Sequence, residues 1–249
     1  MTRIARDRAA TTDADRLAAA NRTLAALDAA GRIRWALGEA TATPLLTSSF
    51  GAQAAVMLHL VTRERPDIPV LFIDTGYLFA ETYAFVETLT AQLGLNLIVY
   101  QPRRSAAWQE AREGQRWEQG LKGLEAYNRE NKIEPMERAL DDLDAGLWFS
   151  GVRRSQSTSR QNLPYVAASG QRLKVHPILD WTDRDVHRYL TANQLPYHPL
   201  WHRGYVSIGD VHSTKSLHEV DSVEATRFNG VKRECGLHEM DFGNEANRF

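Results

Sequence analysis

Short apolar segments alternate with amphipathic segments from about residue 44 to residue 150, and this alternation constrains the fold more than any other feature. Four strands are predicted at residues 45–49, 69–74, 95–100 and 147–150. Helices are predicted at about 52–63, at 81–93 and between 105 and 145. This order indicates βαβ units, a parallel sheet and right-handed crossovers. Ligands of such sheets bind beyond the carboxyl ends of the strands, where the polar turns at 48–51, 74–76 and 150–160 lie.

The segments before and after this alternating part have different patterns. Residues 12–30 are alanine-rich and predict a helix that stops at Gly31, with a second short helix at 32–39. A further helix opens at Thr182 or Asp183, whereas the last forty residues have weak periodicity. We therefore expect a helical N-terminal lead-in at 1–40, an α/β domain at 41–215 and a mobile or partly helical tail at 216–249.

The charge of the chain is balanced, which limits the partners that it attracts. Thirty lysines and arginines stand against 31 aspartates and glutamates in 249 residues, a net charge of −1. No overall field favours nucleic acid or an anionic membrane, so any anion site must be local. No apolar run approaches the roughly 18 residues of a membrane span, and the start of the chain has no secretory signal. We expect a cytoplasmic protein that binds neither nucleic acid nor membrane.

Cys235 is the only cysteine of the chain. Lys232 and Arg233 precede it and His238 follows it, a setting that favours the nucleophilic thiolate. A small buried cysteine is the alternative, although the charged flanks argue against burial. One thiol forms neither an intrachain disulfide nor a multi-cysteine metal or iron–sulfur site. If Cys235 takes an oxidised group from a substrate, another molecule must supply the resolving thiol.

Two turns after predicted strands have the composition of anion sites. Residues 48–53 read Ser-Ser-Phe-Gly-Ala-Gln and join a strand to a helix, where free backbone N–H groups bind anions. An ordinary helix cap is the alternative, because the turn has no Walker lysine and no dinucleotide fingerprint. Residues 151–160 contain Arg153, Arg154 and Arg160, whose forks match phosphate or sulfate oxygens. A solvated basic loop is the alternative for this second turn.

Histidines are frequent in the second half of the chain, at 198, 202, 212, 218 and 238. His198 and His202 are four residues apart, but Pro199 between them disfavours a regular helix. The chain also lacks a His-Glu-x-x-His pattern. We therefore predict no metal site.

Five motifs occur together in the chain, and as a set they are specific. They are Ser-Ser-Phe-Gly-x-Gln at 48–53, Ile-Asp-Thr-Gly at 73–76, Gly-Val-Arg-Arg-Ser-Gln-Ser at 151–157, Lys-Val-His-Pro-Ile at 174–178 and Glu-Cys-Gly-Leu-His at 234–238. From about residue 20 to 239 the chain resembles the thioredoxin-dependent phosphoadenylyl-sulfate reductases of sulfate assimilation. The resemblance implies an adenine-nucleotide α-hydrolase-like fold, a Rossmann-like α/β arrangement. Related pyrophosphatases carry Ser-Gly-Gly-x-Asp-Ser at the first turn, so the sequence here disfavours pyrophosphate cleavage.

A sister group of this family reduces adenylyl sulfate and binds a [4Fe–4S] cluster through four cysteines. At the matching positions this chain has Tyr127, Asn128, Asp210 and Ser213, so all four ligands are missing. This loss is characteristic of the enzymes that use the 3′-phosphorylated substrate. The resemblance therefore implies no cofactor.

The activity that the resemblance implies is reduction of 3′-phosphoadenylyl sulfate to sulfite and adenosine 3′,5′-bisphosphate. Thioredoxin, with glutaredoxin as an alternative donor, would supply the electrons through a thiosulfonate on Cys235, in a homodimer. We expect catalytic roles for Cys235 and His238. We expect substrate contacts from Ser48, Ser49, Phe50, Gly51, Gln53, Asp74, Thr75, Gly76, Lys132, Gly151, Arg153, Arg154, Arg160, Arg227, Lys232 and Arg233. Two rival interpretations are an ATP pyrophosphatase-type ligase or thiolase on the same scaffold and a nucleotide-binding module without activity.

Overall fold

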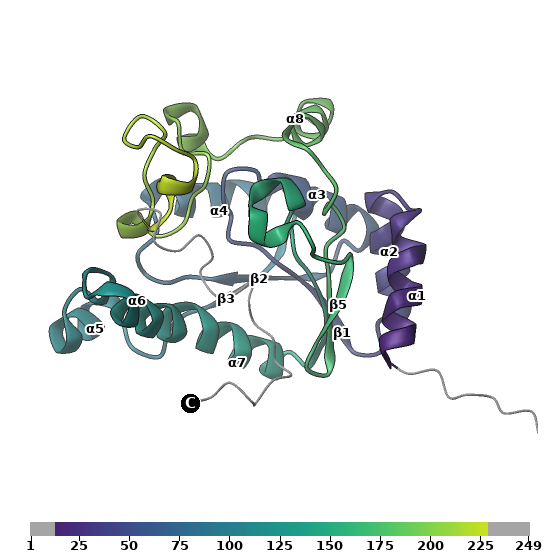
Figure 1. Ribbon diagram of the computed structural model, residues 1–249, viewed down its shortest axis with the longest axis horizontal. Helices are drawn as coiled ribbons and strands as arrows, with labels where there is room; N and C mark the ends of the chain where they lie inside the picture. Colours follow the sequence, from purple (N-terminus) through teal and green to yellow (C-terminus); the bar gives the residue numbers. More distant parts are fainter. Residues whose placement is uncertain (1–12, 229–249) are drawn as a thin grey trace, which may run out of the picture.

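The computed structural model describes residues 13–228, and the predictions for Lys232, Arg233, Cys235 and His238 lie outside the described residues. One sheet forms the centre of the fold (Figure 1). It has six strands in the order β3-β2-β1-β4-β6-β5. The strands are β1 (Thr43–Thr47), β2 (Pro69–Ile73), β3 (Asn96–Tyr100), β4 (Ala145–Phe149), β5 (Val166–Ser169) and β6 (Arg172–Val175). Neighbouring strands from β3 through β6 are parallel, and only β5 runs antiparallel. The predicted parallel α/β sheet is thus confirmed.

The central strands are apolar because both faces of the sheet are covered. Leu46 of β1 pairs in register with Val70 of β2 and Phe149 of β4, and all three side chains are fully buried. Leu45 points to the other face and packs in a second apolar cluster with Leu140. Burial on both faces explains the continuous apolar runs that the sequence shows.

Helices cover the two faces of the sheet in separate layers. Figure 1 shows α3 (Ala55–Glu64) and α4 (Ala80–Leu93) on one face and α6 (Gly120–Asn128) and α7 (Glu134–Asp142) on the other. The remaining α-helices are α1 (Asp13–Ala25), α2 (Ala29–Glu39), α5 (Ala106–Glu113) and α8 (Asp183–Ala192). Short helical turns lie at Arg116–Glu118, Arg129–Ile133, Arg154–Gln156, Thr158–Arg160, Pro199–Arg203, Val211–Ser213 and Glu224–Thr226. Within residues 13–228, no helix is long and apolar enough to span a membrane.

The boundary between the first two helices differs from the prediction. Gly31 does not end a helix, because α2 starts at Ala29 and contains it. The side chain of Asp28 caps α2 by accepting a hydrogen bond from the Gly31 amide at 2.7 Å, and this cap separates the two helices. Both helices belong to the main core, since Leu24 and Ile33 are fully buried within it.

The β5–β6 hairpin was not predicted from the sequence. Arg172 and Lys174 interrupt the apolar pattern of β6, which is half-buried rather than covered on both faces. Helix α1 lies along the outer strand, and its Asn21 side chain hydrogen-bonds to Val166 of β5 as a neighbouring strand would. The Asn21 amide nitrogen donates to the Val166 carbonyl at 2.8 Å, and the Val166 amide donates to Asn21 Oδ1 at 3.1 Å. This contact protects the edge of the sheet.

We predict that Asn21→Ala lowers the free energy of unfolding by about 1–3 kcal/mol, because both backbone groups of Val166 lose their partner in a partly buried place. Thr23→Ala on the same helix is the matched control, since the exposed Thr23 hydroxyl bonds only to Ala19 of its own helix. Urea denaturation of both variants measures the difference. If both variants lost the same free energy of unfolding, the contact between Asn21 and Val166 would contribute nothing specific to stability.

Candidate functional site: a cation-lined cavity at the strand ends

A cavity of about 320 Å³ opens at the carboxyl ends of β1, β2 and β4. The chain leaves β1 toward β2 on one side, and β4 later joins β1 on the other, so the cavity lies at the topological switch point of the sheet. Many of the residues predicted to contact substrate line it, namely Ser48, Ser49, Gly51, Gln53, Thr75, Lys132, Gly151, Arg153, Arg160 and Arg227. The three turns that the sequence analysis singled out therefore meet in one place.

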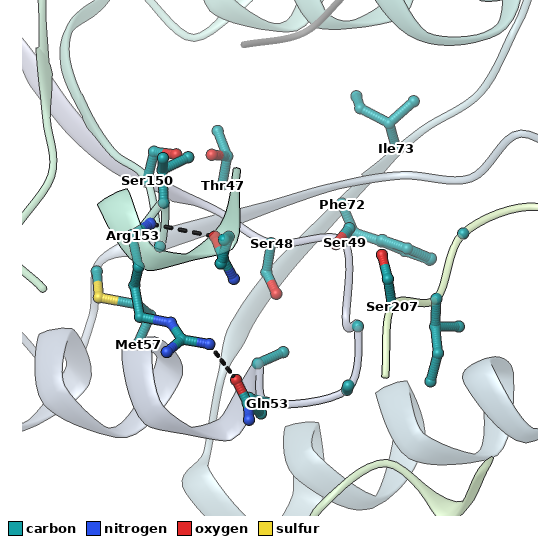
Figure 2. A pocket seen from close by; sticks show the side chains of 18 of the residues that line it. Thr47, Ser48, Ser49, Gln53, Met57, Phe72, Ile73, Ser150, Arg153 and Ser207 are labelled. Carbon is teal, nitrogen blue, oxygen red and sulfur yellow. Dashed lines mark hydrogen bonds between the residues drawn. The ribbon is translucent and has the colours of Figure 1, made fainter. Parts of the chain in front are cut away.

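The turn after β1 presents two serines to the cavity (Figure 2), and the buried ring of Phe50 holds this turn in place. Phe50 has a φ of 48°, which is unusual for a bulky residue, and the Ser48 hydroxyl accepts a hydrogen bond from its amide at 3.1 Å. The Phe50 ring is fully buried and packs edge-on against Phe72 at 5.2 Å. The structure thus places the Phe50 side chain in the core beneath the turn rather than on the cavity wall.

Arg153 follows β4 and reaches across the cavity floor to the first turn. Its guanidinium donates to Gln53 Oε1 at 2.6 Å, as Figure 2 shows, and pairs with Asp183 at 2.9 Å. Only 4% of Arg153 is exposed. Gln156 accepts hydrogen bonds from the Arg153 amide and from the Arg160 guanidinium. These amide side chains fix the orientation of two cations beside the cavity.

Arg154, the neighbour of Arg153, points elsewhere. Its guanidinium lies 5.0 Å from the centre of the Tyr165 ring and donates to the Leu163 carbonyl at 2.9 Å. Arg154 is not among the residues that line the cavity. Its position indicates a role in holding the 163–165 segment.

Asp74 and Gly76 shape the turn after β2 without lining the cavity. The Asp74 carboxylate accepts hydrogen bonds from the Gly76 amide at 2.9 Å, from the Tyr83 hydroxyl at 2.7 Å and from Gln101 at 2.7 Å. Gly76 has a φ of 76°, a conformation that glycine adopts without strain. Burial and the Asp74 hydrogen bond both raise the pKa of Tyr83, so this hydroxyl remains a donor. Thr75, between the two, faces the cavity.

A buried ion pair that the sequence analysis did not foresee closes one end of the cavity. Lys132 Nζ lies 2.6 Å from Asp210 Oδ2, and the Thr75 hydroxyl donates to Asp210 Oδ1 at 2.6 Å. The side chains of Lys132 and Asp210 are 7% and 1% exposed. Burial alone would raise the pKa of Asp210, but the charge and hydrogen bond of Lys132, together with the Thr75 hydrogen bond, hold the pKa below the usual value. The Asp210 carboxylate is therefore ionised at neutral pH.

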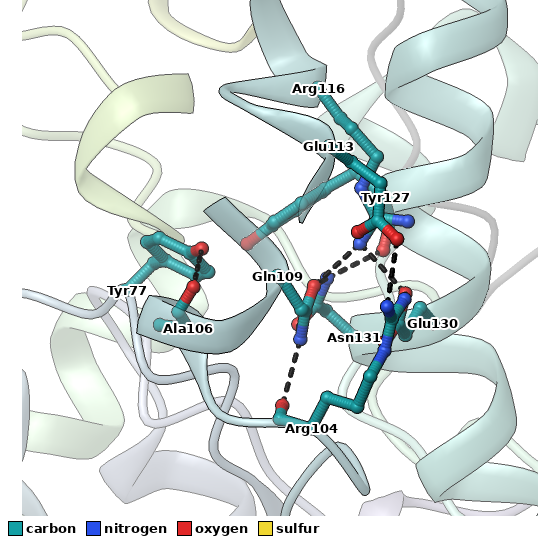
Figure 3. A network of polar contacts seen from close by, with 9 residues as sticks. All are labelled: Tyr77, Arg104, Ala106, Gln109, Glu113, Arg116, Tyr127, Glu130 and Asn131. Atoms are coloured by element: carbon teal, nitrogen blue, oxygen red, sulfur yellow. Dashed lines mark hydrogen bonds and ion pairs between the residues drawn. The ribbon is translucent and has the colours of Figure 1, made fainter. Parts of the chain in front are cut away.

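Lys132 lies on a π-helical turn, η2 (Arg129–Ile133), that joins α6 to α7. Such turns are common at functional sites, because the extra residue redirects the side chains around it. Asn131 on the same turn exchanges two hydrogen bonds of 2.9 Å with Gln109 of α5. Arg104 binds Glu130 through both carboxylate oxygens, and Arg116 joins the same network (Figure 3). This network holds the turn that carries Lys132.

Two of the positions that the sequence analysis matched to cluster ligands, Tyr127 and Asp210, lie close together, and burial and the charge of Asp210 both raise the pKa of Tyr127. Tyr127 is buried and its ring contacts that of His212 at 4.8 Å, next to Asp210 and Ser213. Burial lowers the pKa of His212 to about 4, so this ring adds no charge at neutral pH. Among residues 13–228, no group of three or more histidine, cysteine, aspartate or glutamate side chains is arranged to hold a metal.

The segment 206–210 forms the remaining wall, and the sequence analysis did not identify it. Leu78 and Asp210 form an antiparallel bridge that attaches the segment to the turn after β2. Figure 2 shows Ser207 on the side of the cavity opposite Arg153. Arg227 also lines the cavity, and its guanidinium lies 3.4 Å from the Ser207 hydroxyl. Within the described part of the chain, Arg227 has no carboxylate partner.

The fold and the cavity define the class of protein first. A mainly parallel six-stranded sheet with a cavity at its switch point is the architecture of adenine-nucleotide α-hydrolase-like proteins, as predicted. The FMN adenylyltransferase of Candida glabrata, solved with FAD and inorganic pyrophosphate, is similar in fold, with a TM-score of 0.59. It is 15% identical and the match covers 86% of this chain and 71% of that one, so the likeness concerns the fold alone.

The family follows from the sequence relatives. Residues 43–216 match the phosphoadenosine phosphosulfate reductase domain, so the chain belongs to this family. The phosphoadenosine 5′-phosphosulfate reductases of Alkalilimnicola ehrlichii and Shewanella oneidensis are 63% and 58% identical, each match covering 88% of this chain and 89% of the relative. The phosphoadenylyl-sulfate reductase of Candida auris, solved as a phosphate complex, is 29% identical to this chain, and the two structures match with a TM-score of 0.72. The match covers 83% of this chain and 99% of the Candida auris chain. The predicted family, and with it the prediction of an enzyme, is confirmed.

Proposed function

We propose that the chain reduces 3′-phosphoadenylyl sulfate to sulfite and adenosine 3′,5′-bisphosphate. The observation that carries this proposal is the gathering of Lys132, Arg153, Arg160 and Arg227 around one cavity, in a chain whose net charge is only −1. Such a local excess of cations suits a ligand with several anionic groups. Family membership supports the same substrate.

The cavity has the composition that a nucleotide requires. Met57, Leu71 and Met136 are among its apolar lining residues and suit the adenine ring. Ser48, Ser49 and Thr75 supply hydroxyl groups beside the cations. We infer that the base lies against the apolar side chains and that the phosphate and sulfate groups lie toward the cations.

The proposed chemistry requires one cysteine of the enzyme and a dithiol donor. The Cys235 thiolate attacks the sulfur of the substrate, the sulfur–oxygen bond breaks, and adenosine 3′,5′-bisphosphate leaves. Cys235 then carries a thiosulfonate. A thiolate of the donor attacks the sulfur of Cys235, the bond to the sulfonate breaks, and sulfite leaves with the electron pair of that bond. The second donor thiol then attacks the mixed disulfide and frees the Cys235 thiolate, so that the donor leaves as a disulfide and has supplied two electrons in all. His238 either assists the leaving phosphate or orients the thiolate.

The single cysteine supports an external electron donor, because the chain has no second thiol to resolve the intermediate. We propose thioredoxin as this donor, with glutaredoxin as the alternative, and a cytoplasmic homodimer as the working form. Cys235 is seven residues beyond Phe228, the last described residue, so covalent geometry allows the two to be at most about 25 Å apart. The cysteine is therefore within reach of the cavity that Arg227 lines.

We predict that removing the 3′-phosphate from the substrate lowers kcat/KM by about five- to 150-fold. Each cation that loses its anionic partner in a partly buried site costs roughly 1–3 kcal/mol. Sulfite release from adenylyl sulfate and from its 3′-phosphorylated form, with reduced thioredoxin in excess, measures the ratio. Equal kcat/KM values would show that the substrate is adenylyl sulfate itself, and release from neither substrate would overturn the proposed function.

A further inference from the structure

An uncharged residue brings together two of the cations at the cavity. The Phe228 ring has Lys132 Nζ at 5.4 Å and the Arg227 guanidinium at 5.2 Å from its centre. Both distances are within the range of attraction between a cation and the face of an aromatic ring. Phe228 is only 7% exposed, which strengthens this attraction because little water screens it. The ring is therefore a shared partner of two like charges.

The two cations differ in their other partners. Asp210 neutralises Lys132, whereas Arg227 has no carboxylate partner among residues 13–228 and only a 3.4 Å contact with Ser207. The Nε atom of Arg227 is buried without a hydrogen-bond partner in the described part of the chain. Arg227 is thus a cation whose orientation depends on packing, and its charge is available to an anion in the cavity.

Gly209 provides the space in which the Arg227 guanidinium lies. A Cβ atom at Gly209 would be 2.3 Å from one guanidinium nitrogen and 2.8 Å from the other and from the central carbon. No side chain fits there unless Arg227 moves. Backbone contacts hold the same segment, since Thr214 and Arg227 form an antiparallel bridge and the Lys215 amide donates to the Thr226 carbonyl at 2.9 Å.

The backbone of Phe228 is also constrained. Its φ of 49° is in the left-handed region, which a bulky residue rarely adopts unless its surroundings fix it. The ring of this constrained residue lies beside Lys132 and Arg227, both of which line the cavity.

We propose that Phe228 is a positioning residue that orients Arg227 and Lys132 toward the anionic groups of the substrate, with Gly209 leaving the space for Arg227. The inference rests on the proposed function and deepens it, because it explains how one ring can hold both Lys132 and Arg227 at the same end of the cavity. It also assigns a role to an uncharged residue that does not line the cavity itself.

The test compares Phe228→Leu with Phe228→Tyr in the full chain. Leucine keeps an apolar side chain but removes the ring, so the KM for 3′-phosphoadenylyl sulfate and the Kd for adenosine 3′,5′-bisphosphate should rise about three- to thirtyfold. The value of kcat at saturation should change by less than about twofold. Tyrosine retains the ring and should restore both constants to near the wild-type values. Phe79→Leu is the matched control, because Phe79 packs edge-on against Tyr205 and, among residues 13–228, no lysine or arginine lies over its ring.

Two further variants distinguish positioning from simple packing. In an Arg227→Met background, Phe228→Leu should raise KM by a smaller factor than in the wild type, since one of its two partners is gone. Gly209→Ala should raise KM with the ring intact, and it keeps the inference testable if Phe228→Leu does not fold. Equal constants for Phe228→Leu and wild type, or for the leucine and tyrosine variants, would overturn the inference. The Kd for adenosine 3′,5′-bisphosphate tests the role of Phe228 without depending on catalysis. If the wild type released no sulfite, the proposed function would be overturned instead.

Discussion

Cys235→Ser is expected to reduce sulfite release by roughly a thousandfold or more, while adenosine 3′,5′-bisphosphate binds with nearly the wild-type Kd. A serine hydroxyl is close in size to the thiol but is scarcely ionised near neutral pH, and it forms no sulfur–sulfur bond. The described cavity is built from residues 47–227, so its cations and apolar walls do not depend on the sulfur atom.

Intact-mass spectrometry reads the two half-reactions directly. Wild-type protein given substrate without a donor should gain the mass of one sulfonate group per chain and then stop. Reduced thioredoxin should remove that mass and release an equal amount of sulfite. The serine variant should gain no mass under the same conditions. A wild type that never gains the adduct, or a serine variant that still turns over, would exclude Cys235 as the nucleophile.

The parts of the site that the sequence predicted are local in the chain. Each of the turns after β1, β2 and β4 follows an apolar strand directly, and the carboxyl ends of parallel strands meet at one edge of a sheet. The sequence could therefore predict that three groups of residues lie close together. These are the first turn, the threonine of the second turn and the arginines of the third. The parallel α/β fold followed from the same alternation.

The residues that were missed depend on contacts between distant segments. Asp210 and Lys132 pair across the cavity, and no local pattern indicates which of many carboxylates meets a given lysine. The wall at 206–210 has no regular secondary structure, and contacts with distant residues such as Leu78, Thr75 and Lys132 attach it to the rest of the fold. The β5–β6 hairpin lacks a strong apolar pattern, because only part of it is covered by the fold.

Arg153 and Arg154 illustrate the limit of composition as a guide. They are adjacent and chemically identical, so the sequence gives no reason to separate them. The chain enters a short 3₁₀ turn at this point, which directs Arg153 toward Gln53 and Arg154 toward Tyr165. One arginine therefore faces the cavity and the other supports the structure beside it.

Asp210→Asn is expected to lower the free energy of unfolding by about 3 kcal/mol or more at neutral pH. Asparagine still accepts the Thr75 hydrogen bond, but it leaves the buried Lys132 ammonium without a counter-charge. Asp221→Asn is the matched control. Because Asp221 is exposed, this substitution should change the free energy of unfolding by less than about 0.5 kcal/mol. Urea denaturation of each variant gives the two values.

The pH dependence of stability should carry the same signature. Because Lys132 holds the pKa of Asp210 below its unfolded value, the pair contributes its full stability above the unfolded pKa of about 3.9. That contribution is lost as the pH falls through the lower pKa of the folded protein. The wild type should therefore lose more stability in acid than Asp210→Asn does, and the two unfolding curves should converge as the pH falls. Parallel curves would show that the carboxylate is not stabilised by its partner.

The decisive comparison adds Lys132→Met to Asp210→Asn. Removing one charge of a buried pair leaves the other unpaired, whereas removing both charges relieves that penalty. The double variant should therefore be more stable than Asp210→Asn alone, although it has lost one more native side chain. It should still bind adenosine 3′,5′-bisphosphate more weakly than the wild type, because Lys132 lines the cavity. If the second substitution lowers stability further, the loss in Asp210→Asn does not arise from an unpaired lysine, and the buried ion pair is not what stabilises this end of the cavity.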